Sequence, residues 1–284
     1  MINFYLITKP GIVLGNLVTV AAGFLLASKG NISLGLFLAT LLGLALIMAS
    51  ACILNNYIDR PLDEKMKRTK NRPLVTGLIA GWQALFYAAC LGVLGSLVLL
   101  KFTNLLAFSV AAVGFFVYVV LYSMWKGRTV YGTAIGSVAG AVPPVVGYCA
   151  VTNHFDTGAL ILFAMLVLWQ MPHFFSIAVY HFDDYAAAKI PTLPIERGML
   201  RTKIHMVIYI IGFILVASLL TYFNYTGYIY LLVAISLGVL WLLLCLQGFN
   251  RTDTRLWGRH MFQLSLILIT LLCLTIPFDL AVTG

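Results

Sequence analysis

Residues 55–73 read NNYIDRPLDEKMKRTKNRP and follow directly on a long apolar run. This stretch holds three of the nine acidic residues and six of the eighteen Lys and Arg residues of the chain. Asn55, Asp59 and Asp63 recur every four residues, so their side chains share one face if the preceding helix continues through them. Two carboxylates placed in this way repel each other, and desolvation at the mouth of a membrane helix adds to that cost.

A divalent cation between the two carboxylates would offset this repulsion. Mg²⁺ prefers carboxylate oxygens and the phosphates of a substrate. The bases that follow suit an anionic ligand bridged by such a metal; they are Lys65, Lys67, Arg68, Lys70 and Arg72. The pattern predicts a Mg²⁺–diphosphate site. A cytoplasmic loop that merely follows the positive-inside rule would explain the bases, but not the aligned carboxylates and Asn55.

The composition predicts a polytopic membrane protein with one domain over residues 1–284. The chain is 62% hydrophobic and only 10% charged, whereas a soluble domain carries about 25% charged residues. The net charge of +9 is expected to reflect basic loops that face anionic lipid, so we expect the lipid bilayer and not nucleic acid as a partner.

Nine apolar runs of about 20 residues predict nine membrane-spanning helices. The fifth run is rich in Gly and Ala and has Pro143 and Pro144 at its centre. Because proline frees backbone carbonyls that lipid cannot satisfy, this helix must be surrounded by others or line a cavity. The predicted spans are 11–28, 33–54, 82–100, 104–124, 132–151, 158–181, 206–223, 228–248 and 261–281.

The connecting loops alternate in charge. Every Lys and Arg except Lys29 and Lys101 falls on the side of the N-terminus, which predicts that this side is cytoplasmic and that the C-terminus lies on the opposite face. Every acid except Asp156 and Asp279 falls on the same side. We therefore expect a site at the cytoplasmic mouth, built from the two long loops 55–81 and 182–205.

The sixth span and the loop after it carry further candidates. His173, Tyr180 and Asp184 are spaced by seven and four residues and are expected on one helical face. An ionisable residue within a membrane is a candidate for function; the alternative is a packed, hydrogen-bonded group of the bundle interior. Asp183 and Asp184 open the second loop, and Lys189 follows them.

Aromatic and sulfur-containing residues in the spans are less specific. Tyr118, Tyr122 and Trp169 are expected to pack in the bundle, or to shield a carbocation through their ring quadrupoles. The cysteines stand singly in apolar runs without metal-binding spacing, and we expect small core residues; they are Cys52, Cys90, Cys149, Cys245 and Cys273.

Four stretches give the chain a family resemblance. They are NNYIDRPLDEKMKRTKNRPL at 55–74, YSMWKGRTVYGT at 122–133, GSVAGAVPPVVGY at 136–148 and WQMPHFFSIAVYHFDDYAAAKIPTLP at 169–194. The chain resembles the protoheme IX farnesyltransferases, or haem O synthases, of the UbiA superfamily of intramembrane prenyltransferases. The resemblance covers nearly the whole chain.

This resemblance implies an all-α fold of nine transmembrane helices around a central cavity, in a bacterial-type cytoplasmic membrane. It implies the conversion of farnesyl diphosphate, haem B and water into haem O and diphosphate, with Mg²⁺ as cofactor. Asn55, Asp59 and Asp63 match the first metal-binding motif. The second motif of many superfamily members, Asp-x3-Asp, is broken because Ala188 stands four residues after Asp184. Whether Asp183, Asp184 or both reach a metal stays open.

The implied mechanism is ionisation of the prenyl diphosphate. Asp59 and Asp63 hold the metal, and His173 lies on the haem side, either as a ligand of haem iron or as a base for the incoming water. A purely structural hydrogen bond of His173 is the alternative. The substrate-binding residues are expected to be Asn55, Lys65, Arg68, Lys70, Arg72, Lys126, Arg128, Tyr122, Tyr180 and Lys189.

Two rival functions stay open from the sequence. One is a UbiA-type enzyme with an aromatic quinone precursor as acceptor, although the MPHF stretch and the broken second motif argue against it. The other is a transporter, although no inverted repeat is evident. Contact with haem–copper oxidase or haem A synthase machinery is a further expectation that the sequence does not decide.

Overall fold

The computed structural model describes residues 2–280, and within them nine helical segments are long and apolar enough to cross a membrane. The predicted number of spans is therefore confirmed. Their bounds are α2 Pro10–Ser28, α3 Leu34–Ile58, α5 Gly81–Phe102, Leu105–Trp125 (α6, η1 and α7), Gly132–Thr152 (α8 and α9), α10 Thr157–Tyr180, α13 Gly198–Tyr222, Tyr228–Asn250 (α14 and η2) and Thr254–Phe278 (α15 and η3).

Two of these helices begin earlier than the sequence predicts. The seventh span was expected from residue 206 and begins at Gly198, and the ninth was expected from residue 261 and begins at Thr254. The first two turns of these helices carry Arg and Lys residues, which lower the local hydropathy. An apolar run therefore marks only the later part of each helix. Residue 281, the last of the predicted ninth span, lies outside the described residues.

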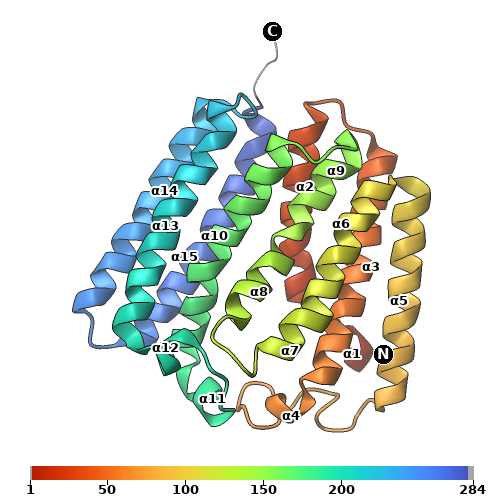
Figure 1. The fold of residues 1–284 in the computed structure, drawn as a ribbon. Coiled ribbons are helices and arrows are strands. Elements are labelled where there is room, and N and C mark those ends of the chain that lie inside the picture. The colour runs from red at the N-terminus through yellow and green to blue at the C-terminus, as the bar shows by residue number, and fades with distance from the viewer. Residues whose placement is uncertain (1, 281–284) are drawn as a thin grey trace.

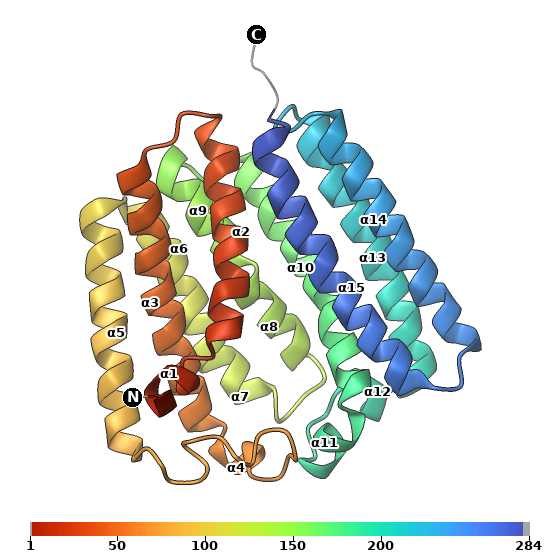
Figure 2. The ribbon, with the colours of Figure 1, turned by 180° about the vertical axis from the view of Figure 1, so that it is seen from behind.

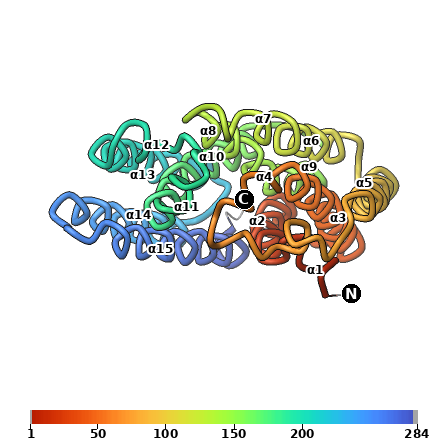
Figure 3. Tube along the Cα trace, turned by 90° about the horizontal axis from the view of Figure 1, so that it is seen from below, coloured from red at the N-terminus to blue at the C-terminus, as the bar shows by residue number. Residues whose placement is uncertain are grey.

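The helices follow one another around a closed bundle (Figure 1, Figure 2). Each span packs against the next one in the chain, and α15 returns to pack against α2. Further contacts cross the bundle, since α2 and α3 both pack on α9, α3 packs on α6, and α10 packs on α15. Seen from one end, the helices form two rows with α5 at one edge (Figure 3).

The fifth span is the most enclosed of the nine, as its prolines predicted. Within an 18-residue apolar stretch of this span, 72% is buried inside the bundle, compared with 17% for the corresponding stretch of α5. The helix breaks at Ala141 between α8 (Gly132–Gly140) and α9 (Val142–Thr152). Pro143 falls in the first turn of α9, where the missing backbone N–H removes no helical hydrogen bond.

One end of the bundle, here called the basic end, carries loops 59–80, 126–131, 181–197 and 251–253. Short helices lie there: α1 Ile2–Ile7, α4 Arg60–Asp63, α11 Phe182–Ala187 and α12 Leu193–Glu196 (Figure 1). The described chain ends at the opposite end (Figure 1). Four of the cysteines are buried as expected, but Cys90 is exposed, so its assignment to the core was wrong.

Candidate active site

Asn55, Asp59 and Asp63 lie at the point where α3 reaches the basic end. Helix α3 ends at Ile58 and α4 begins at Arg60, but the hydrogen-bond pattern continues through the junction. The Asp59 N–H donates to the Asn55 carbonyl at 2.9 Å, and the Asp63 N–H donates to the Asp59 carbonyl at 2.8 Å. The three residues therefore stay one helical turn apart, and all three are at least 96% buried.

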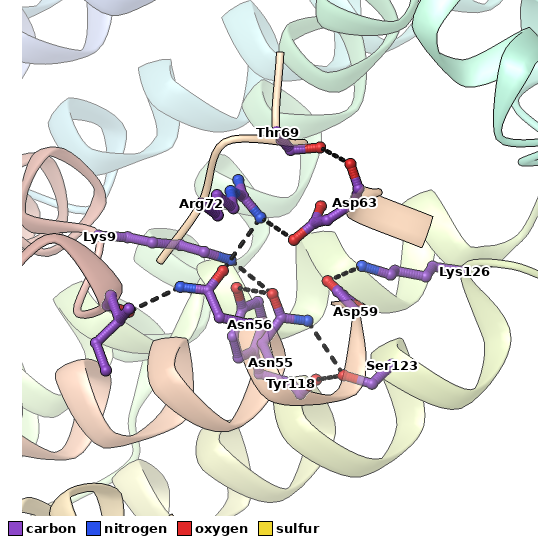
Figure 4. A network of polar contacts seen from close by, with 11 residues as sticks. Lys9, Asn55, Asn56, Asp59, Asp63, Thr69, Arg72, Tyr118, Ser123 and Lys126 are labelled. Carbon is purple, nitrogen blue, oxygen red and sulfur yellow. Dashed lines mark hydrogen bonds and ion pairs between the residues drawn. The ribbon is translucent and has the colours of Figure 1, made fainter. Parts of the chain in front are cut away.

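Each buried carboxylate is paired with a base from a different part of the chain (Figure 4). Lys126, which follows α7 (Ser123–Trp125), donates from Nζ to Asp59 Oδ2. Arg72 Nη1 lies 2.6 Å from Asp63 Oδ2 and also donates to Asn56 Oδ1 at 3.1 Å. Pairing is required here because an isolated charge at such depth costs several kcal/mol.

The Asn55 amide joins three spans in the same network (Figure 4). Its Oδ1 accepts from Lys9 Nζ at 2.7 Å and from the Tyr118 hydroxyl at 3.3 Å, and its Nδ2 donates to Ser123 Oγ at 3.2 Å. Lys9 precedes α2, and the other two partners belong to the fourth span. Asn55 thus holds the start of the first span and the end of the fourth span against the carboxylates.

Lys9 was not among the predicted site residues. The pKa of its ammonium is lowered to about 8, chiefly by burial and also by the neighbouring Arg72 and Lys126 cations, while Asp59 acts in the opposite direction. The residue has a left-handed conformation, with φ of 52°, directly before Pro10 at the start of α2. A lone base next to the proline that begins the first span is the only sequence signal that pointed to it.

The fourth span contains a π-helix, η1 Val117–Tyr122, between α6 (Leu105–Phe116) and α7. The rings of Tyr118 and Tyr122 stack with centroids 5.6 Å apart, and Lys126 Nζ lies 5.4 Å from the Tyr122 centroid. Ser123 Oγ donates to the Tyr118 carbonyl at 3.3 Å. Segments of π-helix occur often at functional sites, and this one directs its polar and aromatic groups to the carboxylates.

The carboxylate pair fits a divalent cation. Asp59 Oδ1 is buried and has no hydrogen-bond partner. Over residues 2–280 no cluster of three or more His, Cys, Asp and Glu residues is preformed. Mg²⁺ does not need such a cluster, because it commonly binds one or two carboxylates and takes its other ligands from substrate phosphates and water. Asp59 and Asp63 supply two such carboxylates, and the Asn55 amide supplies a further oxygen.

The second basic-end loop packs on the first through Asp184 and an apolar cluster. The Lys67 N–H donates to Asp184 Oδ1 at 3.0 Å, and His181 Nδ1 lies 3.9 Å from Asp184 Oδ2. Asp183 instead is exposed in a separate cleft of about 240 Å³ beside Arg255. Of the two acids, Asp184 is the one that faces the first loop. The apolar cluster consists of Met66, Ala188 and Ile190 with Leu62 and Tyr185.

The predicted substrate-binding bases divide into two groups. Arg72 and Lys126 lie in the network. The remaining predicted bases are exposed and have no hydrogen bond or ion pair to the network in the described chain; they are Lys65, Arg68, Lys70, Arg128 and Lys189. Arg128 lines an outward cleft of about 370 Å³.

His173 forms no hydrogen bond or ion pair with the carboxylates in the described chain. It is 92% buried on α10, its ring stacks on Trp169 with centroids 4.6 Å apart, and its Nδ1 lies 2.7 Å from Ser265 Oγ on α15. His173 and Tyr180 both lie on α10, but the expectation that the same helical face continues to Asp184 was wrong. Helix α10 ends at Tyr180, because the following His181 leaves the helical conformation, and Asp184 lies on α11. Tyr180 faces Arg255 at 5.8 Å.

Comparison with known proteins decides the family. Residues 16–267 match the sequence model of the UbiA prenyltransferase family. The chain belongs to the UbiA prenyltransferase family. It is 59% identical over 281 residues to the protoheme IX farnesyltransferase of Protochlamydia amoebophila (strain UWE25), with 99% of each chain covered. It is 51% identical to the protein of the same name from Serratia proteamaculans (strain 568), with 100% and 97% covered. The resemblance seen in the sequence is confirmed.

Solved structures of the UbiA type have the same fold. A digeranylgeranylglyceryl phosphate synthase superposes with a TM-score of 0.80 at 16% identity, covering 97% of this chain and 96% of that one. A UbiA homologue from Archaeoglobus fulgidus bound to GPP and Mg²⁺ superposes with a TM-score of 0.71 at 16% identity, covering 97% and 99%. The predicted all-α UbiA architecture is confirmed, and the chain is a UbiA-type prenyltransferase.

Proposed function

We propose that this UbiA-type prenyltransferase transfers the farnesyl group of farnesyl diphosphate to a vinyl group of haem B, with addition of water, to give haem O and diphosphate. The observation that carries the proposal is the buried Asn55–Asp59–Asp63 row with bases converging on it from three parts of the chain. The acceptor is supported by the relatives that are named protoheme IX farnesyltransferases.

The charges of the network suit a diphosphate. Lys9, Arg72 and Lys126 face only two carboxylates, so the network has an excess of positive charge. These bases would donate to the phosphate oxygens and stabilise the charge that develops on the leaving group. Asn55, Asp59 and Asp63 would hold Mg²⁺, which when bound supplies further charge stabilisation to the diphosphate. Asp184, which faces the first loop, is the second-loop candidate for metal binding.

The reaction then needs a dry site. Breaking the bond between the farnesyl C1 and the diphosphate oxygen leaves an allylic cation, and the stacked rings of Tyr118 and Tyr122 can stabilise it through their π faces. The terminal carbon of the haem vinyl bonds to the farnesyl carbon. Water adds to the other vinyl carbon and releases one proton. Exclusion of bulk water by the bundle protects the cation from premature hydrolysis.

The deciding experiment is incubation of the purified protein with haem B, farnesyl diphosphate and Mg²⁺, followed by haem extraction and mass analysis. We expect haem O, loss of product when Mg²⁺ is chelated, and no product from Asp59→Asn. A parallel incubation with an aromatic quinone precursor tests the rival acceptor. A prenylated aromatic product without haem O would overturn the proposal, and so would the absence of any prenylated product, as expected of a transporter.

The membrane orientation is part of this proposal: the basic end is cytoplasmic in a bacterial-type cytoplasmic membrane. Lys70 and His154 are exposed at opposite ends of the bundle and suit cysteine labelling once exposed Cys90 is replaced by Ala. An impermeant thiol reagent applied to intact cells should label His154→Cys and not Lys70→Cys, and the reverse pattern would invert the orientation. A single domain over residues 1–284 and contact with haem–copper oxidase or haem A synthase machinery are likewise proposed.

A further inference from the structure

Ser265 determines which nitrogen of His173 carries the proton. Ser265 Oγ lies 2.6 Å from the Phe262 carbonyl oxygen and 2.7 Å from His173 Nδ1. A serine hydroxyl has one proton, and two oxygens 2.6 Å apart need that proton between them. Ser265 therefore donates to the Phe262 carbonyl and accepts from His173. The neutral imidazole is then protonated at Nδ1 and has its lone pair at Nε2.

The orientation of the His173 ring is held on several sides. Trp169 stacks on one face with an interplanar angle of 21°, and its Nε1 donates to the Ser265 carbonyl at 3.0 Å. The rings of Phe262 and Phe174 lie at centroid distances of 5.1 and 5.6 Å. This aromatic enclosure fixes the direction in which the Nε2 lone pair points.

His173 Nε2 is free to bind a ligand. It forms no hydrogen bond with any described residue. Unlike the fully buried polar atoms of the described chain that have no hydrogen-bond partner, Nε2 keeps some accessible surface, although the side chain as a whole is only 8% exposed. The small accessible part of this buried ring thus includes the nitrogen with the lone pair.

The surroundings favour a metal ligand over a base. A base must become a cation, yet none of the ion pairs among the described residues includes His173, so the cation would be unpaired inside the membrane. Binding a metal needs the lone pair and no charge on the ring. Metal-binding histidines also donate their other N–H to a fixed acceptor, and Ser265 is such an acceptor here.

We propose that His173 Nε2 is an axial ligand of the iron of the haem substrate, and that Ser265 is a positioning residue that holds the ring in the required tautomer. The inference rests on the proposed function, because it takes haem B as the acceptor. The ligand bond anchors the porphyrin among Trp169, Phe174 and Phe262. Its vinyl edge is thereby held relative to the carboxylate network, on which the prenyl diphosphate is proposed to bind.

The first test is a titration of the purified protein with ferric haem B, followed by absorbance and electron paramagnetic resonance. We expect the wild type to show a histidine-ligated spectrum, and we expect His173→Ala to lose this spectrum and to bind haem more weakly. Added imidazole should restore the ligated spectrum in His173→Ala. An unchanged spectrum and affinity in His173→Ala would overturn the ligand assignment.

The second test separates the positioning role of Ser265 from a structural role. Ser265→Ala should weaken haem binding and shift the iron–histidine stretching frequency in the reduced complex, and Ser265→Thr, which keeps the hydroxyl, should recover both. The matched control is Ser137→Ala, because Ser137 is also buried and donates to the carbonyl three residues earlier, at 2.7 Å, without touching His173. Equal spectra in Ser265→Ala, Ser137→Ala and the wild type would refute the positioning role.

Failure of this inference and failure of the proposed function give different results. If the wild type forms haem O and His173→Ala keeps the wild-type haem spectrum, the function stands and the ligand assignment is wrong. If the wild type shows a histidine-ligated spectrum that His173→Ala loses, but makes no haem O, the ligand assignment stands and the proposed reaction is wrong.

Discussion

Arg72 Nη1 lies 2.6 Å from Asp63 Oδ2, and the two side chains differ greatly in exposure, at 27% and 3%. The carboxylate is enclosed and needs a cation beside it, whereas the guanidinium keeps access to solvent. A diphosphate can therefore bind Arg72 while Asp63 stays buried, provided that a metal ion replaces Arg72 as the cation that neutralises the carboxylate. The same reasoning applies to Lys126 and Asp59, whose side chains are 16% and 5% exposed.

Replacement of either carboxylate should abolish turnover while the protein stays folded. Asp59→Asn and Asp63→Asn keep the side-chain shape but remove a charge that would bind Mg²⁺, so we expect turnover to fall by at least about 100-fold. Product analysis measures the rate, and thermal unfolding in detergent measures the fold. The matched control is Glu64→Gln, because Glu64 is exposed and adjacent to Asp63. Near-normal turnover of both variants at limiting Mg²⁺ would remove the carboxylates from the mechanism.

The binding of prenyl diphosphate should weaken as the pH rises through about 8. The pKa of Lys9 is lowered to about 8, so Lys9 is a cation below this pH and loses its charge above it. We expect KM for the diphosphate to rise above pH 8 in the wild type. Lys9→Arg should lose this dependence, because arginine stays charged. A wild-type KM that is constant from pH 7 to roughly pH 9.5, in spite of the lowered pKa, would show that the charge of Lys9 does not contribute to binding.

Deletion of one residue from the π-helix should disconnect the fourth span from the site. Removing Val120 converts η1 towards an α-helix and rotates all following residues by about 100°. Ser123 and Lys126 would then turn away from Asn55 and Asp59, and we expect loss of activity with the bundle still assembled. The control is Val120→Ala, which keeps the length of the segment. Full activity of the deletion variant with an unchanged melting temperature would contradict the assigned role of η1.

Two glycines should be required where α2 crosses α9. A Cβ added at Gly23 would meet the Pro144 carbonyl oxygen, and one added at Gly147 would meet the Val20 carbonyl oxygen. Because backbone atoms cannot move aside as a side chain can, we expect Gly23→Ala and Gly147→Ala to destabilise the protein by about 1–3 kcal/mol each. The comparison variant is Gly15→Ala on the same helix α2, where nothing lies within 4 Å of the added atom. Equal melting temperatures of all three variants would refute this packing argument.

Much of the architecture could be predicted because it depends on local composition and spacing. The nine spans follow from the length of the apolar runs, since lipid accepts only backbone that satisfies its own hydrogen bonds. The enclosure of the fifth span follows from Pro143 and Pro144 for the same reason. The row of Asn55, Asp59 and Asp63 follows from the helical repeat, and the hydrogen bonds through Asp59 preserve that repeat beyond the end of α3.

Tertiary structure alone decided which distant groups meet that row. Lys9 and Lys126 are 46 and 67 residues away from their partners, and no sequence spacing relates them to Asn55 and Asp59. Lys65, Lys70 and Arg72 are bases of the same loop, yet of these three only Arg72 reaches a carboxylate. The path of the loop after α4 decides which of these side chains points inward.

The same holds for His173. Its position in a span was visible in the sequence, but the break after Tyr180 removed its expected alignment with Asp184. Its partner Ser265 lies 92 residues away on α15. Helical periodicity determines which side chains share a face within one helix, and it says nothing of the face that another helix presents to them. That choice is made by the packing of the whole bundle, through which α15 returns to α10 and α2.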